Sequence, residues 1–344
     1  MTAPSLKSKQ IKKDTEIVTR FYETVPTTVQ RLLARPEKDA LSFEHMGIAP
    51  IASPDSVIEI IQQARRLIFP GYFIQTRMDP INLESFLCQE AMTLFNRLSQ
   101  QIVLSIQHAC LRLDAPCSRC LESSQKTAVQ FIQSMPDLKA ILAGDIDAAF
   151  AGDPAAKSYD EIIFSYPGLF AITVYRMAHK LHEMDVPLLP RMMTEYAHSL
   201  TGIDIHPGAK IGRRFFIDHG TGVVVGETTE IGNRVRIYQG VTLGALSLPA
   251  DEIDQIRNQK RHPTIGDDVI IYSNATLLGS KAVIGARSII GGNVWITESV
   301  PQDTKVMLKK PELVYIGNHS RSDGLKQVHQ KSRHGGKGGE NEIC

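Results

Sequence analysis

Three titratable residues interrupt a stretch of chain that is otherwise made largely of small and aliphatic side chains. Asp204 and His219 lie fifteen positions apart, and His262 ends a polar segment further along. A histidine whose ring is oriented by a carboxylate is the usual construction of a general base. The residue types therefore suggest proton-transfer chemistry. A surface histidine that only forms local hydrogen bonds would show the same pattern.

A six-residue repeat predicts the elements that must position these residues. Such a period is typical of a parallel β-helix, in which three short strands form one triangular coil of about eighteen residues. Asp204 and His219 then fall on successive coils. The repeat slips by two residues after the third position and by one residue after the tenth. The aliphatic positions are Ile205, Ile211, Ile217, Val225, Ile231, Ile237, Leu243, Ile265, Ile271, Leu277, Ile284, Ile290 and Ile296.

The rest of the chain predicts an α+β organisation. Residues 1–202 have apolar positions three and four apart, which indicates helices. Ser53-Pro54 is a typical helix start, Asp137 is expected to cap a later helix, and Gly202 ends the last one. We expect a helical domain over 1–202, whose first hundred residues are an extension of unclear role, and a β-helix domain over 203–318. The polar segment 245–262 should protrude from it as a loop that lines a site, and 319–344 should be a flexible tail.

Bulk composition narrows the class of protein. The net charge is +1, so charge gives no reason to expect a nucleic-acid or membrane partner. No apolar stretch is long enough to span a bilayer, and no signal-peptide pattern follows Met1, so we expect a cytoplasmic enzyme. The odd number of cysteines, five, argues against a disulfide framework. Cys110, Cys117 and Cys120 are expected to be reduced thiols near a helix connection, with a zinc site or a redox pair as the alternative.

Several motifs together resemble the serine O-acetyltransferase family. They are Gly-Ile-Asp-Ile-His-Pro-Gly-Ala-Lys-Ile-Gly from Gly202, Ile-Asp-His-Gly-Thr-Gly from Ile217, Gln-Gly-Val-Thr-Leu-Gly from Gln239 and Arg-His-Pro from Arg261. Gly-Asp-Pro-Ala-Ala from Gly152 and Tyr-Arg-Met-Ala-His from Tyr175 also look like the helices that precede the β-helix in that family. The resemblance covers roughly residues 137 to 317, and it implies a left-handed β-helix.

The resemblance implies transfer of acetyl from acetyl-CoA to the hydroxyl of L-serine in cysteine biosynthesis. It places the general base at His219 and the carboxylate that orients it at Asp204. Asp153, Asp218, Arg261 and His262 match the family's serine-binding positions. A planar guanidinium suits the substrate carboxylate, and aspartates suit its ammonium group. No metal is needed, because the thioester is already activated.

The resemblance also implies a homotrimer, with CoA in a groove between neighbouring β-helices and with a dimer of trimers as a further option. L-cysteine is expected as a feedback inhibitor. Family members that dock into O-acetylserine sulfhydrylase use a terminal isoleucine, whereas Ile343 is followed here by Cys344, which argues against that complex. Small residues that match positions near CoA are Gly244, Ala245, Ser273, Gly279 and Gly292. The corners of the coil demand glycine in any case, so each of these positions has a purely structural alternative.

Three other functions share part of this pattern. Another hexapeptide acyltransferase would keep the repeat and the histidine but lack Asp153 and the Arg261-His262 pair. A zinc hydro-lyase on the same fold would need three histidine ligands, two of them closely spaced on neighbouring coils, and the histidines here do not follow that spacing. A non-catalytic assembly module would need no histidine and aspartate beside a protruding loop.

Overall fold

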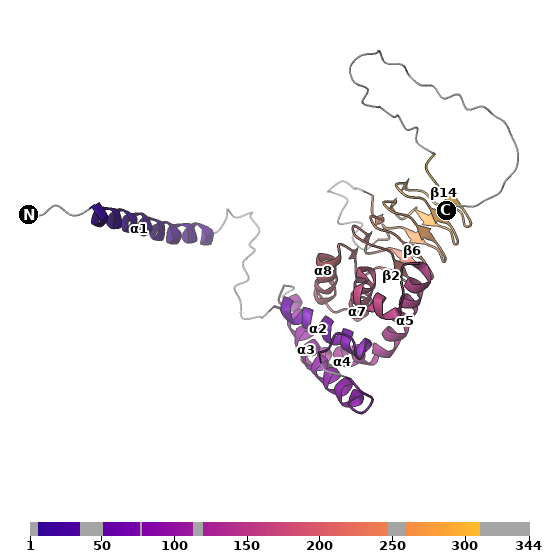
Figure 1. Ribbon diagram of the computed structural model, residues 1–344, viewed down its shortest axis with the longest axis horizontal. Coiled ribbons are helices and arrows are strands. Elements are labelled where there is room, and N and C mark those ends of the chain that lie inside the picture. The colour runs from indigo at the N-terminus through magenta and orange to yellow at the C-terminus, as the bar shows by residue number, and fades with distance from the viewer. Residues whose placement is uncertain (1–5, 35–50, 76–77, 113–119, 247–258, 310–344) are drawn as a thin grey trace, which may run out of the picture.

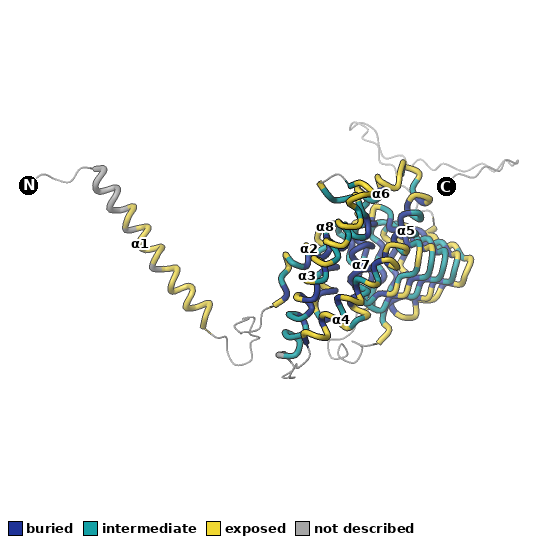
Figure 2. The backbone as a smooth tube through the Cα atoms, turned by 90° about the horizontal axis from the view of Figure 1, so that it is seen from below, coloured by how far each residue is buried: buried dark blue, intermediate teal, exposed yellow. Residues whose placement is uncertain are grey.

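The computed structural model describes residues 6–34, 51–75, 78–112, 120–246 and 259–309 (Figure 1). Helix α1 (Leu6–Leu33) stands apart from the other elements in both views, and the residues of it whose burial is described are exposed (Figure 2). None of the described helices combines the length and the low polarity that crossing a membrane requires.

The helical region contains seven further helices in the described residues, and one of the two predicted helix starts is confirmed. Ser53 caps α2, because its side chain accepts a hydrogen bond from the backbone N–H of Ser56. The expected cap at Asp137 is wrong: Ser134 holds the N-cap position, and Asp137 lies in the first turn. The helices are α2 (Pro54–Ile68), α3 (Leu83–Arg112), α4 (Cys120–Gln133), α5 (Met135–Gly152), α6 (Tyr159–Ser165), α7 (Pro167–Glu183) and α8 (Leu189–Thr201).

One of the described cysteines departs from the expectation of reduced thiols. Cys120, at the start of α4, is disulfide-bonded, so that expectation is wrong for this residue. Cys88 and Cys110 are free. Cys117 and the tail 319–344 lie outside the described residues. An odd cysteine count argues against a framework in which every cysteine is paired, but it does not exclude one bond.

The repeat forms three parallel sheets that make the faces of a prism. Sheet A has the order β1-β4-β7-β10-β13, sheet B the order β11-β8-β5-β2, and sheet C the order β14-β12-β9-β6-β3. The strands are β1 (Asp204–Ile205), β2 (Lys210–Ile211), β3 (Phe216–Ile217), β4 (Val224–Val225), β5 (Glu230–Ile231), β6 (Arg236–Ile237), β7 (Thr242–Gly244), β8 (Thr264–Ile265), β9 (Ile270–Ile271), β10 (Thr276–Leu278), β11 (Val283–Ile284), β12 (Ile289–Ile290), β13 (Trp295–Ile296) and β14 (Lys305–Val306).

An aliphatic column fills the prism, as the repeat predicts. In sheet A, Ile205 pairs with Val225, Val225 with Leu243, and Leu243 with Leu277. All four side chains are buried. Stacking each coil on its neighbour buries apolar area that one coil could not bury alone, which is why the period of the repeat reports the core. The predicted fold class, helices followed by a parallel β-helix, is confirmed.

Helix α7 covers the open end of the first coil. Among the described residues no coil precedes β1–β3, so some backbone carbonyls of these strands have no ladder partner there. The Tyr175 hydroxyl donates to the carbonyl of Ala209 at 2.6 Å, and the Arg176 guanidinium donates to the carbonyl of Gly212 at 2.8 Å. His179 Nδ1 lies 2.7 Å from the carbonyl of Pro207. The Tyr-Arg-Met-Ala-His motif therefore acts as a polar cap on the β-helix.

Candidate functional site

The predicted base sits on an enlarged corner of the prism. The corner between β3 and β4 runs from Asp218 to Val223, two residues longer than the corner between β6 and β7 that stacks on it. This insertion is the slip seen in the sequence. His219 has φ of 58°, and its side chain is 73% exposed. A left-handed conformation is uncommon for a residue other than glycine, although histidine, asparagine and aspartate adopt it more readily than most. The insertion lifts the imidazole out of the column of coils.

Two carboxylates from different elements accompany this histidine. Asp218 Oδ1 lies 3.7 Å from His219 Nε2. Asp153 directly follows the last residue of α5, where it forms the C-cap. Its Oδ1 accepts the backbone N–H of Ala155 at 2.8 Å, and its Oδ2 accepts the hydroxyl of Tyr166 at 2.5 Å. The end of a helix and a corner of the β-helix therefore place three of the predicted site residues in one neighbourhood.

The electrostatics of the two carboxylates differ. The hydrogen bond from Tyr166 is the main cause that lowers the pKa of Asp153, and the charges of His219 and Arg236 act in the same direction. Burial raises the pKa of Asp218, and the charge of His219 opposes that rise. The charges of His219 and Arg236 lower the pKa of both aspartates. The corner can therefore bind a cation at Asp153, beside an imidazole that can accept a proton.

Arg261 and His262 lie at the opposite side of sheet A, where its strands end, in the corner between β7 and β8. The Arg261 guanidinium donates to the carboxylate of Glu227. His262 Nδ1 accepts the backbone N–H of Thr228 at 3.1 Å and lies 2.9 Å from the Thr228 hydroxyl. His262 is 7% exposed. Burial, together with the neighbouring Arg261 charge, lowers its pKa to about 4. Its imidazole is therefore neutral near pH 7 and can donate through the other ring nitrogen.

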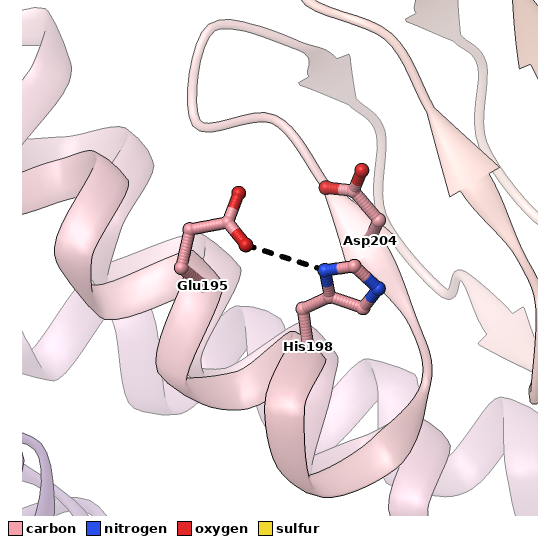
Figure 3. A group of neighbouring side chains, drawn as sticks. All are labelled: Glu195, His198 and Asp204. Carbon is pink, nitrogen blue, oxygen red and sulfur yellow. Dashed lines mark hydrogen bonds and ion pairs between the residues drawn. The ribbon is translucent and has the colours of Figure 1, made fainter.

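Asp204 lies beside two residues of helix α8. On β1, its carboxylate groups with Glu195 and His198 from the last turns of α8, their ligand atoms within 4.8 Å of one another (Figure 3). His198 Nδ1 lies 3.3 Å from Glu195 Oε2. No hydrogen bond or ion pair joins Asp204 to His219 in the described part of the chain, so their pairing stays a prediction.

The positions expected near CoA border sheet A, and at two of them a larger side chain would meet a neighbour. Gly244 and Ala245 end β7 and begin the corner after it, and Gly279 follows β10 at the same corner. A Cβ on Gly244 would lie 2.9 Å from a methyl carbon of Leu278. At the other corner, a Cβ on Gly292 would lie 3.0 Å from the carbonyl oxygen of Ser273. Their contact with CoA stays a prediction.

Two residues of this neighbourhood were missed from the sequence. Tyr166 ends α6 and begins α7, and thirteen positions separate it from its carboxylate partner. Arg236 lies on β6, with its guanidinium over the ring of Phe216 at 5.4 Å. A Cβ on Gly152 would lie 2.3 Å from Arg236 Nη2, so the glycine at the end of α5 allows the arginine to approach. The six-residue repeat constrains only the side chains that point inward, so it does not predict which outward residues, such as Arg236, take part in a site.

Comparisons with known proteins agree on one family. The chain is 47% identical over 256 residues to the plasmid serine acetyltransferase of Synechococcus elongatus, covering 73% of this chain and 80% of that protein. It is also 47% identical over 178 residues to serine acetyltransferase of Bacillus subtilis, covering 52% of this chain and 77% of that protein. No protein-family model matches the chain.

Solved structures lead to the same family. Serine acetyltransferase 1 of Entamoeba histolytica, in complex with L-cysteine, superposes with a TM-score of 0.64 at 34% identity, covering 81% of this chain and 94% of that one. Isoform 3 of the same organism, in complex with cysteine, also has a TM-score of 0.64, at 33% identity, covering 86% of this chain and 95% of that one. The helices followed by three parallel sheets are consistent with the left-handed β-helix of these proteins.

Proposed function

The chain belongs to the serine acetyltransferase family, and we propose that it acetylates the hydroxyl of L-serine from acetyl-CoA with His219 as general base. One observation carries the assignment of the base: the two-residue insertion lifts His219 from the corner, beside Asp153 and Asp218. The exposed imidazole can reach a bound hydroxyl, and the ionised carboxylate of Asp153 can hold the ammonium group of the same substrate.

The reaction needs one proton carrier. The serine hydroxyl is a weak nucleophile, so His219 accepts its proton as the oxygen attacks the thioester carbonyl. The tetrahedral intermediate then collapses, the carbon–sulfur bond breaks, and the imidazolium returns the proton to the CoA thiolate. Asp204 is proposed to orient His219 and stabilise the imidazolium, by the logic of a histidine–carboxylate pair.

The predicted site residues of one chain lie at two separate corners of its prism, which favours a site shared between chains. His219 and Asp218 lie at one edge of sheet A, and Arg261 and His262 lie at the other. In a cyclic trimer of prisms, one edge of a chain can face the other edge of its neighbour. The neighbour's guanidinium then binds the substrate carboxylate, and CoA occupies the groove between the prisms. We propose this homotrimer, with pairing of trimers as a further assembly.

The same site is proposed to bind L-cysteine. Cysteine keeps the ammonium and carboxylate groups of serine and replaces the hydroxyl by a thiol, so the groups proposed to hold serine fit both molecules. The Entamoeba histolytica relative in complex with L-cysteine supports this proposal. Competition between L-cysteine and L-serine in steady-state kinetics tests it, and inhibition that excess serine does not relieve would contradict it.

The deciding experiment follows CoA release from acetyl-CoA with L-serine, with glucosamine and with buffer alone. The test variant is His219→Asn, because asparagine keeps the left-handed backbone; Asn274 and Asn293 adopt it at the stacked corners, with φ of 59° and 58°. We expect serine-dependent turnover to fall by about a hundredfold or more in this variant. Full turnover in His219→Asn would remove the general-base role, and turnover with glucosamine instead of serine would refute the proposed acceptor.

A further inference from the structure

Tyr166 is held by two helices at once. Its backbone N–H donates to the carbonyl of Ile162 and so ends α6, and its carbonyl accepts the N–H of Phe170 in the first turn of α7. Pro167 follows at the first position of α7, which restricts the backbone further. The tyrosine ring therefore leaves a rigid junction, and its direction does not depend on a mobile loop.

The hydroxyl of this tyrosine completes the anchoring of the Asp153 carboxylate. Tyr166 donates to Oδ2 at 2.5 Å, and the backbone N–H of Ala155 donates to Oδ1 at 2.8 Å. With one donor on each oxygen, the carboxylate plane cannot rotate without losing a hydrogen bond. Bonds to an ionised acceptor are about twice as strong as those between neutral groups. The remaining lone pairs of both oxygens stay available for a cation.

We propose that Tyr166 is a positioning residue for the acceptor substrate: it fixes the Asp153 carboxylate in the orientation that receives the ammonium group beside His219. This inference rests on the proposed function, because Asp153 matters only if it binds the amino acid. It predicts that the phenol hydroxyl affects binding of L-serine and leaves binding of acetyl-CoA unchanged, since no hydrogen bond joins it to the described residues expected near CoA.

The charged groups that face Asp153 agree with this role. Asp218 and His219 approach it from the enlarged corner, and Arg236 approaches it from β6. The Tyr166 hydroxyl lowers the pKa of Asp153 more than any of these charges does. Burial and the Asp153 carboxylate raise the pKa of Tyr166 itself, so the phenol stays protonated and acts as a donor. Removing the hydroxyl should therefore raise the pH at which Asp153 loses its proton.

Tyr166→Phe tests the proposal, with Tyr159→Phe as the matched control. The Tyr159 hydroxyl also donates to an aspartate, Asp147 at 3.2 Å, and it belongs to the adjacent helix α6. Losing a hydrogen bond to a charged group should raise KM for L-serine about tenfold to a hundredfold in Tyr166→Phe. We expect no change in KM for acetyl-CoA, and only a small fall in the unfolding temperature, because the same hydrogen bond also contributes to the folded state. The acid limb of the kcat/KM profile for L-serine should move to higher pH.

The outcomes separate this inference from the proposed function. If both tyrosine variants change KM for L-serine equally, or if Tyr166→Phe raises both KM values together with a much lower unfolding temperature, the positioning role is wrong. If the unaltered protein shows no turnover with L-serine, the proposed acceptor is wrong. Calorimetric titration with L-serine then still decides the role of Tyr166, because weaker binding in Tyr166→Phe than in Tyr159→Phe supports it and equal binding overturns it.

Discussion

The buried ion pair between Asp145 and Arg176 should contribute strongly to the stability of the contact between the helices and the β-helix. Asp145, on α5, accepts Arg176 Nε at 2.6 Å and Nη2 at 3.0 Å, and it also accepts the backbone N–H of Phe215 at 2.9 Å. The two side chains are 0% and 6% exposed. The pair thus joins α5, α7 and the first coil. Asp153 directly follows the last residue of the same helix α5.

The expected magnitude follows from burial. Asp145→Asn keeps the shape of the side chain but leaves the guanidinium charged and buried, with the carbonyls of Ile211 and Gly212 as its remaining partners. Breaking one side of a buried pair costs about 3–5 kcal/mol of unfolding free energy. The control is Asp268→Asn, which alters an equally bidentate pair with Arg234 at 2.6 and 2.8 Å.

Exposure separates the two pairs. Arg234 and Asp268 have side chains 50% and 39% exposed, so solvent screens their pair and it should contribute little to stability. Urea unfolding of both variants, at one protein concentration, measures the difference. Raising the salt concentration should weaken the small effect of Asp268→Asn and leave the effect of Asp145→Asn largely unchanged. Equal losses of stability in the two variants would refute the argument that burial decides the strength of these pairs.

Two further predictions concern His262 and Gly168. Because burial lowers the pKa of His262 from 6.5 to about 4, the folded state binds fewer protons than the unfolded state between these values. Stability should therefore fall as the pH drops through that window, by up to roughly 3 kcal/mol, and His262→Gln should flatten the stability profile measured by urea unfolding. A Cβ at Gly168 would lie 2.3 Å from the carbonyl oxygen of Ile217, so Gly168→Ala should cost about 1–3 kcal/mol in thermal unfolding. Gly144→Ala, where the nearest atom is 3.5 Å away, should be neutral or slightly stabilising, and a larger loss there than at Gly168 would contradict this reasoning.

The β-helix could be predicted from the sequence because its core repeats. Each aliphatic residue at a repeat position indicates a strand whose side chain faces the core. Many such positions support the same prediction, so one ambiguous position does not change it. The helices were predicted for a similar reason, since the apolar spacing and the Ser53-Pro54 start agree. Asp137 was misplaced as a cap because an acidic residue stabilises the first turn as well as the cap position.

The contacts of the site could not be predicted, because they join elements whose relative placement the pattern does not specify. The bond from Tyr166 to Asp153 depends on how α7 leaves α6, and the approach of Arg236 depends on a glycine at the end of another helix. The group that Asp204 forms with Glu195 and His198 depends on the angle between α8 and the prism. Types and spacing identified candidate residues, but only packing decides which of them meet.

The faults of the repeat locate the site better than its regularity does. The two-residue slip lies at the corner between sheets C and A and carries His219, and the long excursion lies at the corner between sheets A and B and ends at His262. The one-residue slip after Leu277 falls at that second corner, beside Gly279. In the described part of the prism, the corners between sheets B and C keep one length, and they carry exposed pairs such as Arg234 with Asp268. An insertion or slip in the repeat disrupts backbone hydrogen bonding between neighbouring coils. Such irregularities are therefore expected where they change the direction of a side chain that the protein uses. These faults all border sheet A, and we infer that this sheet is the face of the prism that carries the site.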